Sequence, residues 1–278
     1  MSARNGRLLR SELRLVFGRR RNQLLLVVTA LFPLLIGIAL RVAAPHGAQP
    51  RGPDHAPLLY AQLAGNGVFL TFTALSTLLV LVLPVVVTVV GGDSMAGEAG
   101  YGTLRYLLTV PAGRTRLLAV KLAATVIFAL SATVIVSAVA LAAGAALFPV
   151  GPVTLLSGAT VSLAAGLVRL LLVTLYVVAA MAALGALALA VSTLTEHALV
   201  AIAAVLMAVV TSEVLDNIPQ LGWLAPYLPT HWWVSFDALL RAPADSVTVG
   251  KGLTSFGIYL AMAVAFAWAR FGSADVTS

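Results

Sequence analysis

Long runs of apolar residues separated by short polar segments dominate this sequence. A membrane-spanning helix needs about 20 mostly apolar residues. Six runs are long enough to span, at residues 24–40, 68–90, 122–148, 170–191, 198–215 and 253–271. The pattern predicts an all-α polytopic membrane protein with six transmembrane helices, built as a single transmembrane domain over residues 1–278.

The stretch between the fifth and sixth runs, residues 216–252, has a different character. It is rich in helix-breaking and aromatic residues, including Pro219, Trp223, Pro226 and Pro229. Trp and Tyr favour the headgroup level of a bilayer, and short broken apolar segments are typical of re-entrant structure. We expect an extracytoplasmic re-entrant region of short helical pieces rather than a seventh span.

The residues before the first run predict an amphipathic helix over 4–17. Arg7, Arg10 and Arg14 share one side at 100° per residue, while the other side is apolar. Such a helix lies flat in the membrane interface with its arginines toward anionic headgroups. Residues 1–21 are therefore expected to form a cytoplasmic interfacial helix, the alternative being a basic flank without defined helix.

Composition supports the membrane assignment and limits the partners. The chain is 60% hydrophobic and only 10% charged, so a soluble fold could not cover its apolar surface. The net charge of +7 is concentrated beside apolar runs, which indicates contact with lipid headgroups and not with nucleic acid. Most Lys and Arg fall on the side of the N-terminus, which places both termini in the cytoplasm of a multi-pass plasma or inner membrane protein.

Catalytic, cofactor and metal sites find no support in the sequence, so none is predicted. The chain has no cysteine, its four histidines show no metal-site spacing, and Gly250-Lys251-Gly252 lacks the remaining residues of a P-loop. Inside the six runs the polar residues are hydroxyls, apart from Glu213 near an end. Ion-driven transport uses ionisable groups at membrane depth. Transport by this chain would thus need energy from a partner.

Small residues at four-residue spacing predict close helix contacts in two runs. They lie at Ala138, Ala142 and Ala146 in the third run and at Ala182, Ala186 and Ala190 in the fourth.

The segment 91–121 between the second and third runs is the most informative. Gly91 and Gly92 are expected to end the second span, and glycines at 100 and 102 to break the helix that follows. Pro111 keeps the preceding residue out of the helical region, so the chain turns there. The segment predicts a hairpin that projects into the cytoplasm.

The polar, glycine and proline residues along this hairpin follow a recognisable sequence motif. Glu98, Gly102, Thr103, Leu104, Pro111, Arg114, Leu118 and Lys121 match the E-x-x-x-G-T-L…P…R…L-x-x-K arrangement. In this pattern, and in its overall layout, the chain resembles the permeases of ATP-binding cassette (ABC) type-2 transporters. The segment 227–231 is similar to a motif of the same family.

That resemblance implies a function and a set of roles. The chain would be the permease subunit of an ATP-driven exporter, pairing with a second permease chain as a homo- or heterodimer. Separately encoded ATPase subunits would bind the ATP and Mg, and they would seat the hairpin as a coupling helix. In this coupling helix Glu98 would offer an anionic contact to the ATPase, Gly102 would permit close approach, and Pro111 would fix the turn. Arg114 and Lys121 would hold the segment at the lipid headgroups.

Further expectations complete this hypothesis. Glu196 and His197 would make a second, smaller cytoplasmic contact, and the cargo would be an unidentified amphiphile. Two alternatives stay open: a non-transporting scaffold or sensor subunit of an ATPase complex, and an intramembrane enzyme. A hairpin that is ordinary loop structure with a positive flank is the simpler interpretation of the same residues.

Overall fold

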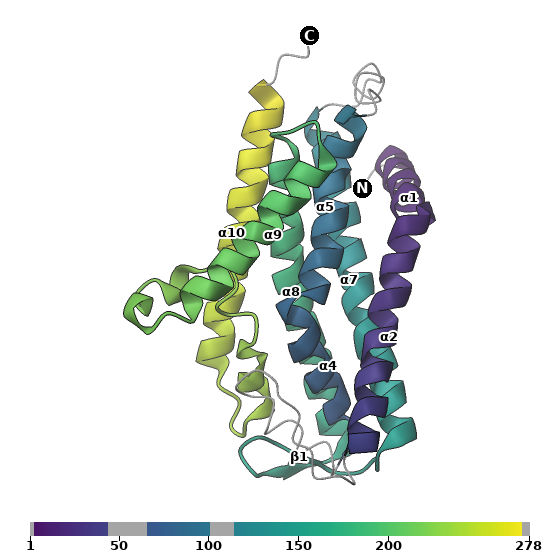
Figure 1. The fold of residues 1–278 in the computed structure, drawn as a ribbon, viewed down its shortest axis with the longest axis vertical. Helices are drawn as coiled ribbons and strands as arrows, with labels where there is room; N and C mark the ends of the chain where they lie inside the picture. Colours follow the sequence, from purple (N-terminus) through teal and green to yellow (C-terminus); the bar gives the residue numbers. More distant parts are fainter. Residues whose placement is uncertain (1–2, 44–65, 101–113, 274–278) are drawn as a thin grey trace.

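The computed structural model describes residues 3–43, 66–100 and 114–273 as a bundle of long helices (Figure 1). The helices and strands are α1 (Ala3–Gly18), α2 (Arg20–Ala43), α4 (Phe69–Val80), α5 (Val82–Gly100), α7 (Arg114–Leu147), β1 (Val153–Thr154), β2 (Thr160–Val161), α8 (Leu163–Ser192), α9 (Ala198–Asp216) and α10 (Ser246–Ser273). Three short 3₁₀ turns lie between α9 and α10: η2 (Pro219–Leu221), η3 (Ala225–Tyr227) and η4 (Ser235–Leu240).

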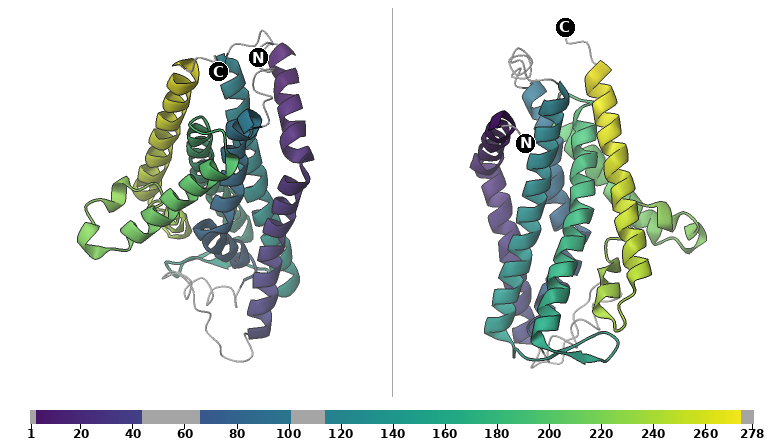
Figure 2. Two further views of the ribbon diagram at one scale, coloured as in Figure 1. Left: turned by 45° about the horizontal axis from the view of Figure 1, so that its top comes forward. Right: turned by 180° about the vertical axis from the view of Figure 1, so that it is seen from behind.

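Six of these helices are long and apolar enough to cross a membrane, which agrees with the predicted number of spans. They cover Arg20–Val42, Val82–Gly100, Thr115–Leu147, Leu163–Ser192, Ala198–Asp216 and Ser246–Arg270. The start of α2 and the end of α10 lie at the same end of the bundle, as an even number of crossings requires (Figures 1 and 2). The chain is therefore an all-helical, multi-pass membrane protein in its described part.

The second apolar run is not one straight helix. It is divided at Leu81, which has φ −143° and ψ −48° and lies between α4 and α5. Pro84 explains the division: it has no N–H for the carbonyl of Val80, and its ring would clash there. The α5 half then continues as a helix through Gly91 and Gly92 to Gly100, and the end of its membrane-spanning part at the two glycines stays a prediction.

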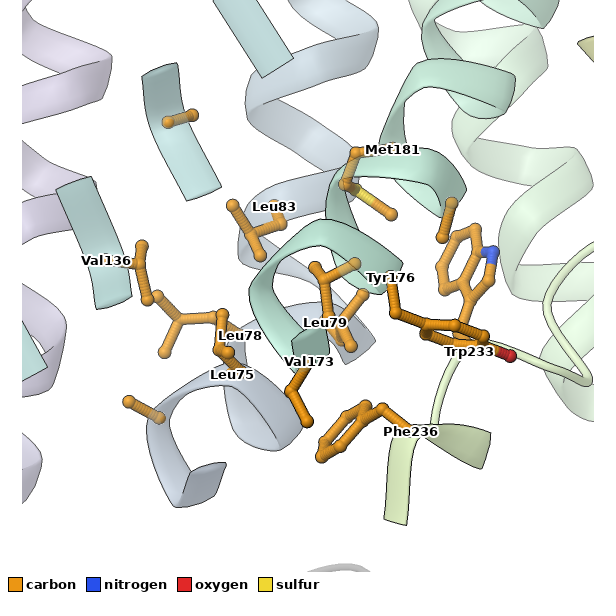
Figure 3. Packing of buried hydrophobic residues seen from close by; sticks show 14 of the residues in the cluster. Leu75, Leu78, Leu79, Leu83, Val136, Val173, Tyr176, Met181, Trp233 and Phe236 are labelled. Atoms are coloured by element: carbon orange, nitrogen blue, oxygen red, sulfur yellow. The ribbon is translucent and has the colours of Figure 1, made fainter. Parts of the chain in front are cut away.

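Helix α8 occupies the centre of the bundle, where α5, α7, α9 and α10 all contact it. Leu75, Leu79 and Leu83 from the broken span face Val173 and Met181 of α8 (Figure 3). Trp233 and Phe236, from the segment before α10, close the same cluster. Lipid tails are as apolar as these side chains, so the hydrophobic effect does not drive the helices together inside a bilayer. Van der Waals contact in such a cluster holds them together instead.

Close backbone contact fixes where α4 starts against α7. A Cβ atom built on Gly144 would lie 2.1 Å from the carbonyl oxygen of Gly67, and one on Gly67 would lie 2.2 Å from that of Gly144. Asn66 supports this crossing, because its Nδ2 donates to the carbonyls of Gly151 and Pro152 at 2.7 and 3.0 Å. The two glycines let the backbones meet without an intervening side chain.

The predicted helix before the first span is present as α1, and Arg7, Arg10 and Arg14 are exposed on it. The chain then turns sharply at Gly18 and Arg19 into α2. The buried Asn22 donates to the Val16 carbonyl at 2.8 Å and Gln23 donates to the Phe17 carbonyl at 2.9 Å, which satisfies two carbonyls at the end of α1. The position of α1 in the membrane interface stays a prediction.

The segment between α9 and α10 contains 3₁₀ turns and no α-helix. Its first part, around η2 and η3, projects sideways from the bundle beside α10 (Figures 1 and 2). Its second part returns to the bundle, where Arg169 of α8 donates to the carbonyl of Arg241 at 2.7 Å. The expected short helical pieces are confirmed in this coarse sense, and their depth in a membrane stays a prediction.

Candidate functional site

Ionised side chains from four helices meet at one end of the bundle. Helix α1 and the first residues of α2 lie there, together with the end of α5 and the start of α7 (Figure 2). Two ion-pair clusters form: Lys121 with Glu12 and Glu98, and Asp93 with Arg19 and Arg21. We refer to these six residues as the ion-pair network.

Lys121 of α7 is the most buried member of the network. Its side chain is 1% exposed, and its Nζ lies 2.6 Å from Glu98 Oε1 and 3.0 Å from Glu12 Oε1. An isolated ammonium at such a position would cost several kcal/mol of desolvation. The two carboxylates, one from α1 and one from α5, compensate that cost and tie three helices to one nitrogen atom.

Asp93 of α5 forms the second cluster one turn deeper in that helix. Its side chain is 8% exposed and its Oδ2 accepts from Arg19 Nη1 and from Arg21 Nη2, the latter at 2.8 Å. A Cβ atom built on Gly97 would lie 2.3 Å from Asp93 Oδ1. Gly97 therefore leaves the space in which the Asp93 carboxylate turns toward the two arginines.

The charges of the network balance between its two halves. The cluster around Lys121 has one negative charge in excess, and the cluster around Asp93 has one positive charge in excess. The arginines are half-exposed, while the Lys121 cluster is nearly closed to solvent. This arrangement makes α1 and the start of α2 an integral part of one end of the bundle and not a detached flank.

The network corrects one role expected from the sequence. Lys121 was expected to meet lipid headgroups, but it points into the bundle, because Glu98 and Glu12 supply its counter-charges. Glu98 likewise turns to Lys121. Arg114 is the first residue of α7. Four other predicted site residues, Gly102, Thr103, Leu104 and Pro111, lie outside the described residues.

The second predicted contact lies beside the end of α5. A Cβ atom on Gly100 would approach the carbonyl oxygen of Glu196 to 2.8 Å, so the α8–α9 loop passes close to the α5 terminus. Glu196 and His197 are both exposed in this loop, and the His197 N–H donates to the Thr195 hydroxyl at 3.1 Å. The structure thus brings the two predicted contact regions to the same end of the molecule.

A further polar cluster joins the end of α9 to the segment after it. His231 Nδ1 lies 2.7 Å from Asp216 Oδ1, and the hydroxyls of Ser212 and Thr230 lie 2.7 Å apart and are buried. Sequence spacing gave no sign of this cluster, because the pairs are separated by 15 and 18 residues across a chain reversal. Within the described part of the chain, no group of three or more His, Cys, Asp or Glu side chains could hold a metal ion.

Comparison with protein families matches residues 57–231 to the family described as "Protein of unknown function (DUF2705)". The matched region includes α4, α5, α7, α8 and α9, and it contains Asp93, Glu98, Lys121, Asp216 and His231. No curated protein matches the chain. No ABC transporter family is matched either, so the resemblance to ABC type-2 permeases, drawn from the Glu98–Lys121 pattern, is wrong.

Proposed function

This chain belongs to the DUF2705 family, and we propose that it acts as the permease subunit of an export complex. In this proposal the chain moves an amphiphilic substrate across the membrane and takes its energy from a separate ATPase. The ATPase would bind the ATP and Mg, and it would contact the end of the bundle that carries the ion-pair network. That end would face the cytoplasm, because most basic residues lie on its side of the membrane.

The ion-pair network is the observation that carries the proposal. An ATPase that binds at the membrane surface can change the conformation of a membrane protein only if a displacement at that surface moves several spans together. Lys121 links α1, α5 and α7 through two short contacts, and Asp93 adds the start of α2. A force on the exposed arginines of α1 would therefore be transmitted to α2, α5 and α7 together.

The polar content of α4, α5, α7 and α8 supports an external source of energy. Away from the network, the buried polar side chains of α4, α5, α7 and α8 are hydroxyls. They are Thr71, Thr73, Ser76, Thr88, Thr125, Thr133, Ser137, Thr174 and Ser192. Proton- or cation-coupled transporters use carboxylates or histidines at such positions. Hydroxyls that donate to carbonyls of their own helix, as Thr125 and Thr133 do, are suited to packing and not to proton transfer.

A second permease chain would complete the transport path. Helix α9 leaves most of its surface uncovered, with Leu199, Met207 and Val214 among its exposed residues. The proposal places either lipid or a second copy of a permease chain against this face.

The experiment uses the natural absence of cysteine. The chain would be purified from its own membranes and tested for a co-purified ATPase whose hydrolysis depends on it. Glu196→Cys reports on the proposed contact, and Val150→Cys, exposed after α7 at the other end, is the matched control. We expect the bound ATPase to protect the cysteine at position 196 from reaction with maleimide and to leave the cysteine at position 150 reactive. Addition of ATP should change the maleimide reactivity at position 196 only.

Transport is tested separately in proteoliposomes that contain the complex. We expect ATP-dependent movement of a fluorescent amphiphile. ATPase binding without movement would favour the scaffold or sensor alternative. If no ATPase co-purifies, or if positions 150 and 196 respond alike, the proposal is wrong.

A further inference from the structure

A groove runs along one face of α10, between that helix and the aromatic segment before it. It has a volume of about 780 Å³. Its α10 wall is formed by Gly250, Lys251, Thr254, Ser255, Ile258, Tyr259 and Met262, and its other wall by Pro226, Tyr227 and Trp232. We call these ten residues the α10 groove. We propose that it binds one anionic phospholipid, with the phosphate at Lys251 and an acyl chain along Ile258 and Met262.

The two walls are held together by hydrogen bonds, so the groove is a built feature of the fold. The Tyr259 hydroxyl donates to the carbonyl of Tyr227, which joins α10 to the opposite wall. Trp232 Nε1 donates to the Pro226 carbonyl at 3.0 Å, and the Trp232 carbonyl accepts from Tyr176 of α8 at 2.7 Å. The aromatic wall is thereby attached to both neighbouring helices.

The α10 wall changes from polar to apolar along its length. Lys251 lies near the start of α10, and Ser255 follows one turn later. Ile258 and Met262 continue the same helix face one and two turns further on. The polar end offers an ammonium and a hydroxyl that donate hydrogen bonds to a phosphate, and the apolar end faces where an acyl chain would lie.

Charge complementarity selects an anion at the polar end. Among the described residues Lys251 forms no ion pair. The nearby carboxylate, Asp245, is engaged by the first turn of α10: it accepts from the N–H groups of Val247 and Thr248 at 3.1 Å and from the Thr248 hydroxyl at 2.5 Å. Lys251 is exposed and interacts with Asp245 only at a distance beyond ion-pair contact, so its ammonium can still donate to a ligand phosphate.

The occupant is a lipid because of where the groove lies. It follows a helix that is long and apolar enough to cross a membrane, so in a bilayer its apolar end lies at a depth where acyl chains are found. An apolar groove with one convergent cation suits a ligand with one charged end and one long apolar end. This inference needs only that the chain sits in a bilayer, and it does not depend on transport or on an ATPase.

The test measures lipid retained by the purified chain in native mass spectrometry. Dioleoyl phosphatidylglycerol and dioleoyl phosphatidylcholine are titrated separately, because they differ in net headgroup charge. We expect one tightly retained phosphatidylglycerol, with weaker retention of phosphatidylcholine. Lys251→Gln should weaken phosphatidylglycerol binding about tenfold or more, because a charge-assisted contact is lost, and Lys251→Arg should restore it.

Two further variants separate the charge from the shape of the groove. A Cβ atom on Gly250 meets nothing within 4 Å, so Gly250→Leu fills the groove without disturbing the fold. Gly257→Leu is its control, because Gly257 is equally open but does not line the groove. Arg41→Gln is the control for charge, since Arg41 is exposed near the same end of the bundle.

The outcomes distinguish the source of the phosphate. Loss of retention in Lys251→Gln and Gly250→Leu, with neither control affected, supports the lipid site. Unchanged retention in both variants overturns it. Competition by glycerol 3-phosphate as strong as that by the whole lipid also overturns it, because the site would then take a free phosphate and not a lipid.

Discussion

Replacing Lys121 by methionine should destabilise this protein more than any other single change of a charged residue. Methionine keeps the length and apolar character of the lysine stem but removes the ammonium. Glu12 and Glu98, with side chains only 14% and 13% exposed, would then face each other across the position that the ammonium had held. Breaking a buried ion pair from one side costs about 3–5 kcal/mol, because the remaining charge stays buried and unpaired.

The distances support a value in that range. At an effective dielectric constant of about 20, charges 2.6 and 3.0 Å apart attract by roughly 5.5–6.5 kcal/mol for each contact. Desolvation of each ion removes several kcal/mol from this gross attraction. The net stabilisation by the intact triad is therefore modest. The Lys121→Met variant loses both attractions, whereas its two carboxylates remain desolvated.

The assay is equilibrium denaturation in detergent micelles without phospholipid, so that no lipid occupies the α10 groove, and it gives the free energy of unfolding for each variant. Lys251→Met is the matched control, because Lys251 is the other lysine of the chain and is exposed; it should change the free energy by no more than about 0.5 kcal/mol. Lys121→Met combined with Glu98→Gln should cost less than the sum of the single changes. If Lys121→Met costs no more than Lys251→Met, or if the double variant is additive, the assigned role of the triad is refuted.

Two further predictions concern the backbone crossing and the start of α10. Gly144→Ala should lower the free energy of unfolding by about 1–3 kcal/mol or more, because the added Cβ meets the Gly67 carbonyl. Gly257→Ala is the control and should be neutral or stabilising, because a Cβ there meets nothing. Both variants are measured by the same denaturation assay. Asp245→Ala should lower the thermal midpoint at neutral pH, because the carboxylate caps α10. The hydroxyl of Thr248 holds the pKa of Asp245 below its ordinary 3.8, so the capping contribution is present above pH 3.8 and is lost as the pH falls through the lowered pKa. The difference from the wild type should therefore disappear in acid, and a difference that persists there would contradict the capping role.

The number and type of the spans followed from local composition. Lipid imposes one requirement on every crossing segment: a long apolar helix with its backbone hydrogen bonds satisfied internally. That requirement acts on each segment separately, so hydropathy alone predicted the number of apolar helices long enough to cross, while the division of the second run at Leu81 was not predicted. The same holds for α1, because its apolar and basic faces repeat with the helical period.

Relations between helices did not follow from the sequence in the same way. Of the two alanine rows, the one at Ala182, Ala186 and Ala190 is buried in α8, whereas Ala138 and Ala142 are exposed on α7. Spacing is the same in both rows. Only the rotation of each helix against its neighbours decides which row is covered.

The candidate site shows the same division. The sequence singled out the segment from Glu98 to Lys121, but it suggested that Lys121 faces headgroups. The tertiary structure decided that Lys121 is buried, because Glu12, more than 100 residues earlier in the chain, comes within 3.0 Å of it. Local chemistry determined which segments cross the membrane and which residues carry charge. The packing of α1, α5 and α7 determined which of these charges meet, because the buried ammonium of Lys121 is stable only beside its counter-ions.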